Sequence, residues 1–83
     1  MRYLFMSRSL TYAQRTARFL EKSGIPAFVI KAPKGTTENG CAYSVSVAYK
    51  NGDNAARLLK NEGLLNGKVF HQDSGGNLRE VDS

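Results

Sequence analysis

The chain of 83 residues contains a single cysteine, Cys41, and no other side chain in it stands out as a candidate for covalent chemistry. A cysteine reacts as its thiolate, and nearby cations or backbone amides favour that form. Lys31 and Lys34 lie shortly before Cys41 in the sequence, while Gly40 and Ala42 flank it. The lysines can supply positive charge, and the small neighbours can supply amides and room for approach. The sequence therefore predicts a thiol site formed by these five residues.

Two interpretations of Cys41 remain open at this stage. Asn39 and Gly40 precede it and leave its surroundings uncrowded, which favours an exposed nucleophile. Free cysteine is also among the most buried residue types, and counting back in steps of two from Tyr43 places Cys41 on the packed face of the strand that follows. An accessible thiol could do chemistry, whereas a buried one would only fill space.

The rest of the composition narrows the chemistry further. One cysteine excludes a disulfide within the chain, and Cys41 with His71 supplies too few ligands for a tetrahedral zinc site. The sequence shows neither the resolving cysteine of a disulfide oxidoreductase nor the general base of a cysteine hydrolase. We therefore expect no metal and no cofactor, and a carrier or binding protein rather than an enzyme.

Length and charge are those of one small globular domain. With 41% apolar and 23% charged residues, the chain can form one hydrophobic core, so we expect a single domain over residues 1–83 with a frayed C-terminal end. The formal charge of +5 comes from cations spread along the chain, which favours a solvated surface over a nucleic-acid site.

The apolar stretch near the N-terminus is short and interrupted by Arg8, so it predicts neither a signal peptide nor a membrane span. A cytoplasmic location is expected.

The first part of the chain predicts a strand, a helix and a second strand. Residues 2–6 are aromatic and apolar without a helical period, and they predict a strand. A helix follows and extends to Lys22, with Ser9 or Thr11 as its N-cap. Thr11 and Gln14 have the spacing of a capping box. The inward stripe of this helix comprises Leu10, Ala13, Ala17 and Leu20. Residues 27–31 predict the second strand.

The middle of the chain contains a loop and the clearest strand. Residues 32–41 are rich in types that favour turns. Residues 43–49 then alternate large side chains with small ones, a period of two that predicts one packed face and one polar face. Ser44 and Ser46 fall on the polar face.

The last part of the chain predicts a second helix and a hairpin. Residues 50–52 favour a turn, after which Asp53 is placed to cap a short helix that Gly63 ends. Residues 68–72 predict a fourth strand, and the glycine-rich turn after it can fold residues 78–81 back beside it.

This order of elements indicates an α+β fold. Two strand-helix-strand halves predict the ferredoxin-like βαββαβ arrangement, an antiparallel sheet with both helices on one face. The C-terminal hairpin would add an extra strand to that sheet.

Four short motifs give the chain a resemblance to a known family. They are Ser9 with Ala13, the Gly24-Ile25-Pro26 turn, Pro33-Lys34, and Cys41 followed by Ala42. On these motifs the whole chain resembles the selenium/sulfur carrier protein-like family of small single-cysteine domains. Lys34 stands where that family usually has Arg, and Ala42 stands where it has Gly.

The resemblance implies a role for the thiol. Cys41 would accept a sulfur or selenium atom as a persulfide or selenosulfide and hand it to another protein. The partners would then be a donor and an acceptor protein, and Lys31 and Lys34 would stabilise the anionic terminal atom. A carrier of this kind needs only one thiol, which agrees with the single cysteine.

The alternative is an RNA-binding or protein-interaction module without covalent chemistry. RNA-recognition domains share this order of elements, but RNA binding would need Tyr43 to face solvent. The serines of that strand would then form the core and its valines would be exposed, which loses too much apolar burial. RNA binding therefore ranks second, with Tyr3 and Phe5 as the residues that would carry it. A protein partner could instead bind a sheet edge or residues 32–40.

Overall fold

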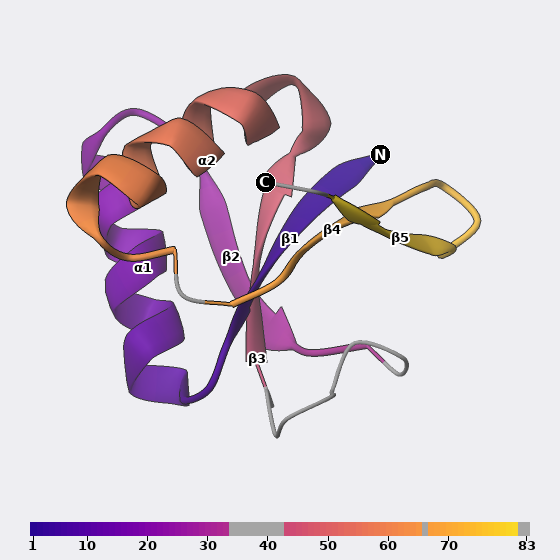
Figure 1. The fold of residues 1–83 in the computed structure, drawn as a ribbon, viewed down its shortest axis with the longest axis horizontal. Coiled ribbons are helices and arrows are strands. Elements are labelled where there is room, and N and C mark those ends of the chain that lie inside the picture. The colour runs from indigo at the N-terminus through magenta and orange to yellow at the C-terminus, as the bar shows by residue number, and fades with distance from the viewer. Residues whose placement is uncertain (34–42, 66, 82–83) are drawn as a thin grey trace.

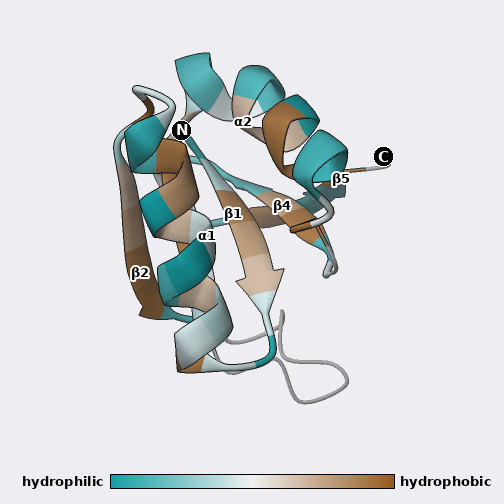
Figure 2. Ribbon diagram, turned by 90° about the vertical axis from the view of Figure 1, so that its left-hand side faces the viewer, coloured by the Kyte–Doolittle hydropathy of each residue, from teal (hydrophilic) through white to brown (hydrophobic). Residues whose placement is uncertain are grey.

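The structure, a computed structural model, describes residues 1–33, 43–65 and 67–81 of the chain. These residues form a five-stranded antiparallel sheet in the order β2-β3-β1-β4-β5, and both helices lie over one face of it (Figure 1; Figure 2). The elements are β1 (Arg2–Ser7), α1 (Leu10–Lys22), β2 (Ala27–Lys31), β3 (Tyr43–Ala48), α2 (Tyr49–Glu62), β4 (Val69–Gln72) and β5 (Leu78–Val81). The predicted α+β fold of ferredoxin-like order is confirmed, and β5 is the extra strand of the C-terminal hairpin.

Helix α1 begins at the cap that the sequence left open between two residues. Ser9 is the N-cap, and its hydroxyl accepts a hydrogen bond from the backbone N–H of Tyr12 at 3.1 Å. Thr11 lies inside the helix, so the predicted capping box is wrong. Leu10 is 43% exposed and does not belong to the inward stripe. The buried residues of the helix are Ala13, Thr16, Ala17 and Leu20.

Helix α2 begins earlier than the sequence predicts. It starts at Tyr49, directly after β3, and its N-cap Ala48 makes no side-chain cap hydrogen bond. The expected turn over residues 50–52 is wrong, because Gly52 is a buried helical residue in contact with the ring of Tyr3. The predicted capping role of Asp53 is also wrong, since its carboxylate accepts a hydrogen bond from the Tyr3 hydroxyl at 2.6 Å.

The sheet is buried on both faces over its central strands. On the helix side, Phe5 of β1 and the valines of β3 pack against both helices, as the alternation of β3 predicts. On the other face, Leu4 and Met6 of β1 form a smaller cluster with Phe70 of β4. Ser44 and Ser46 lie on this second face, opposite the valines as predicted, but they are buried, at 0% and 4% exposure. Arg2 covers part of it, because its Nε donates a hydrogen bond to the Ser46 hydroxyl.

The contact between α2 and β1 predicts the effect of a small substitution. A Cβ atom at Gly52 would overlap the ring of Tyr3, which is held by its hydrogen bond to Asp53 and by packing against His71. We expect Gly52→Ala to lower the free energy of unfolding by about 1 to 3 kcal/mol, because the helix or the ring must shift. Urea unfolding monitored by circular dichroism measures this loss.

Gly75 provides the matched control for that substitution. It lies in the β4–β5 turn, and a Cβ there would make only ordinary contacts of 3.4 and 3.5 Å. We expect Gly75→Ala to change the free energy of unfolding by less than about 0.5 kcal/mol, as at most surface positions. Equal losses for the two variants would show that the close approach at Gly52 does not limit stability.

Candidate functional site

The predicted thiol site falls mostly outside the described residues. Cys41, Lys34, Gly40 and Ala42 all lie there, so their assignment as a thiol site stays a prediction. Lys31 is described: it is the last residue of β2 and its side chain is exposed. Its position can therefore be related to the strand that follows Cys41 in the sequence.

Strands β1 and β2 end at the same edge of the sheet at which β3 begins. Tyr43, the first residue of β3, is paired with Lys31 of β2 on one side and with Ser7 of β1 on the other. Tyr43 is half-buried and packs against the helix-side core. Because Cys41 precedes Tyr43 by two residues in the sequence, the chain that carries the cysteine joins the sheet at this end.

Two further sources of positive charge lie at the same end of the sheet. Arg8 is exposed and directly follows Ser7, the partner of Tyr43. Helix α1 begins at Leu10, and its first turn contains no acidic residue that would offset the partial positive charge of the helix N-terminus. Together with the exposed Lys31, these groups place positive charge at the end of the sheet at Tyr43.

Sequence reasoning missed Arg8 because it is far from Cys41 along the chain. Only the pairing of β1 with β3 places Arg8 next to the strand that follows the cysteine. The sequence did indicate that β1 and β3 are adjacent, because they are neighbours in a ferredoxin-like sheet. The pairing of Ser7 with Tyr43 depends on the register, which the sequence did not give.

The carboxylate of Glu80 lies away from this end of β3. Glu80 is on β5, at the opposite edge of the sheet from β2, and its carboxylate pairs with Lys68 at 3.6 Å.

A second group of polar and aromatic side chains lies near the start of α2. The ring of Tyr3 is 4.3 Å from the ring of His71 and 5.4 Å from that of Tyr49, measured between centroids. Burial, followed by the hydrogen bond to Asp53, raises the pKa of Tyr3 to about 12. Nε2 of His71 is buried and makes no hydrogen bond within the described part of the chain. This group fixes the first turn of α2 against the sheet.

The structure also bears on the RNA-binding alternative. Tyr3 and Phe5, the rings that would have to stack on bases, are 5% and 2% exposed and face the helices. Stacking on a base needs an accessible ring face, so these two residues cannot supply it in this fold. Tyr43 packs on the same side, as the alternation of β3 predicts.

The described part of the chain contains neither a cluster of metal ligands nor a helix that could span a membrane. Over residues 1–33, 43–65 and 67–81, no three His, Cys, Asp or Glu side chains come together as metal ligands would. Neither α1 nor α2 is long and apolar enough to cross a lipid bilayer.

The raised pKa of Tyr3 predicts how stability depends on pH. The phenol ionises near pH 10 in the unfolded chain and near pH 12 in the folded one, so its contribution is complete below pH 10 and is lost as the pH rises toward 12. In Tyr3→Phe we expect a loss of about 1 to 3 kcal/mol at pH 8, from the hydrogen bond to Asp53. The difference between the two proteins should shrink at pH 11, and urea titrations at both values test this. A difference that stays constant would contradict the assigned pKa.

The comparisons with known proteins add one finding. A family model described as "Putative Se/S carrier protein-like" matches residues 2–71, from the start of β1 to His71 in β4. The match ends before the hairpin strand β5. No curated protein and no solved structure matches the chain.

Proposed function

The chain belongs to the family of Se/S carrier-like proteins, and on that premise we propose that Cys41 carries a sulfur or selenium atom between two other proteins. The proposed carried forms are a persulfide and a selenosulfide. Family membership is the observation that supports this role most strongly. The single cysteine agrees with this role, because each protein that passes on one atom needs only one thiol.

The transfer needs no oxidant or reductant. The thiolate of Cys41 attacks the terminal sulfur of a donor persulfide, a new S–S bond forms, and the old S–S bond breaks as the donor leaves as a thiolate. Attack by an acceptor thiolate on the terminal sulfur of the Cys41 persulfide repeats the exchange in the other direction. In both steps the carried atom keeps its oxidation state, and the electron pair of the broken bond leaves on the departing sulfur.

The electropositive end of the sheet supports this chemistry. A thiolate and a persulfide are both anions, and cations or helix N-termini near them favour the charged forms. Lys31, Arg8 and the start of α1 lie where the chain from Cys41 enters β3. We further propose that Lys34 adds charge and that Gly40 and Ala42 leave the sulfur accessible and offer backbone amides.

Sulfur loading tests the proposed function directly. We expect the protein, incubated with a cysteine desulfurase and cysteine, to gain the mass of one sulfur atom in intact mass spectrometry. The added mass should disappear on treatment with a reductant and should never form in Cys41→Ser. A wild-type protein that stays unmodified while the desulfurase itself is charged with sulfur would contradict the carrier role. Replacing the donor with a selenium source separates the two elements.

The role of Arg8 and Lys31 has a separate test. Arg8→Glu/Lys31→Glu replaces two cations by anions at the end of the sheet that continues toward Cys41. We expect the rate of Cys41 alkylation by iodoacetamide at pH 7 to fall about threefold, because the thiolate is less favoured. A stopped-flow or mass-spectrometric time course measures the rate.

A control with the same net charge completes that test. Lys50 and Arg57 are exposed residues of α2, a helix that starts where β3 ends, and Lys50→Glu/Arg57→Glu makes the same change in charge. We expect this variant to react at a rate close to that of the wild type at an ionic strength that screens distant charges. Equal slowing of both variants would mean that only the net charge matters.

A further inference from the structure

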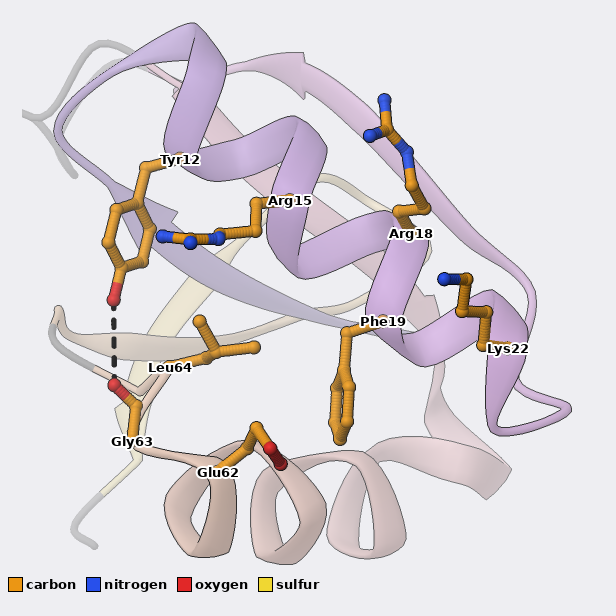
Figure 3. Close-up of a pocket in the computed structure, with 8 residues that line it drawn as sticks. All are labelled: Tyr12, Arg15, Arg18, Phe19, Lys22, Glu62, Gly63 and Leu64. Carbon is orange, nitrogen blue, oxygen red and sulfur yellow. Dashed lines mark hydrogen bonds between the residues drawn. The ribbon is translucent and has the colours of Figure 1, made fainter.

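A basic groove lies between α1 and the C-terminal end of α2 (Figure 3). It is a hollow of about 500 Å³, on the side of the sheet that the helices cover. Its lining comprises Tyr12, Arg15, Arg18, Phe19, Lys22, Glu62, Gly63 and Leu64. None of these residues belongs to the predicted thiol site.

The charge of the groove is unbalanced. Arg15, Arg18 and Lys22 follow one another at spacings of three and four residues along α1, so like charges are neighbours on the helix surface. Such neighbours disfavour a helix, and no ion pair compensates them within the described chain. Lys22 lies in the last turn, where a cation complements the helix dipole, but the two arginines have no such role. Glu62 is the one acidic residue in the lining.

The floor of the groove is apolar and firmly held. Phe19 and Leu64 are partly buried and pack against the helix-side core. The Tyr12 hydroxyl lies 3.5 Å from the carbonyl oxygen of Gly63, which joins α1 to the end of α2. The backbone N–H of Leu64 donates to the carbonyl of Leu59 at 2.9 Å, so the chain after α2 is fixed as well. A ligand would therefore meet a preformed surface.

The directions of the cations indicate the size of the ligand. In Figure 3 the side chain of Arg15 extends toward Tyr12, whereas those of Arg18 and Lys22 extend away from α2. Groups that diverge in this way cannot enclose one small anion. An adjoining hollow, lined by Arg15 and Arg18 together with Ser9, Thr11 and Gln14, continues the basic surface toward the start of α1. The geometry suits an extended ligand that places several negative charges along the helix.

We propose that this groove binds an acidic segment of a partner protein. Carboxylates of the segment would pair with Arg15, Arg18 and Lys22, and an apolar side chain between them would contact Phe19 and Leu64. A protein ligand is favoured over a nucleic acid because Glu62 lies on the opposite side of the groove and would repel a continuous row of phosphates. The proposal does not depend on whether Cys41 carries sulfur.

The test uses the full chain and a synthetic probe. The probe is an amphipathic peptide of about 14 residues, roughly four helical turns, with leucines on one face and glutamates on the others. In ¹H–¹⁵N correlation spectra we expect it to shift the amides of residues 12–22 and 62–64. We expect Arg15→Glu/Arg18→Glu to weaken its binding at least about tenfold, because two charge pairs become repulsive.

Controls distinguish the groove from the overall charge. Lys50→Glu/Arg57→Glu has the same net charge as the groove variant and is expected to weaken peptide binding less than about twofold at moderate salt. Arg15→Gln/Arg18→Gln is the milder variant if the charge reversal disturbs α1, and the dispersion of each spectrum reports folding. The sulfur-loading assay on the same variants keeps the two proposals separate.

Three results would overturn the proposal. The first is the absence of saturable binding by the peptide, and the second is equal weakening by the groove variant and its charge-matched control. The third is tighter or equal binding to the groove by a single-stranded oligonucleotide of similar charge. That result would assign the surface to nucleic acid.

Discussion

The antiparallel pairing of β1 with β3 is the interaction on which the arrangement of the molecule depends. It runs from Arg2 opposite Ala48 to Ser7 opposite Tyr43, through the centre of the sheet. A slip of one residue would turn every side chain of one strand to the opposite face. Both faces of these strands are buried, with Val45 and Val47 on the helix side and Leu4 and Met6 on the other. The register is therefore strongly specified, and it determines that Ser7 of β1 lies opposite Tyr43.

Local sequence patterns predicted the fold well where the bounds of a helix or strand depend on the residues of that element alone. The predicted bounds of β2 match the structure, and Gly63 ends α2 as predicted, where it adopts the left-handed conformation. The start of α2 was beyond such reasoning. Lys50, Asn51 and Gly52 resemble a turn, but the missing side chain of Gly52 allows the helix to approach Tyr3, and this contact between distant segments overrides the local preference.

The candidate site could be predicted only in the part that lies near Cys41 in sequence. Lys31 was proposed in this way, and it lies opposite Tyr43 at the end of β2. Arg8 was missed, since its relation to the cysteine passes through the pairing of Ser7 with Tyr43. The burial of Ser44 was also missed, because alternation alone describes one face of a strand and says nothing about what covers the other.

Helix α1 connects two regions where cationic side chains of the described residues gather. Its N-terminus lies at the end of the sheet that continues toward Cys41, and its basic residues form one side of the groove against α2. The helix carries three cations and one anion, and its dipole adds positive charge at the start. A partner with acidic side chains along α1 would be attracted by the same field that favours a thiolate near the helix start. Because the groove and the sheet end use different residues, the proposed recognition of a partner and the proposed transfer of sulfur can be altered independently by substitution.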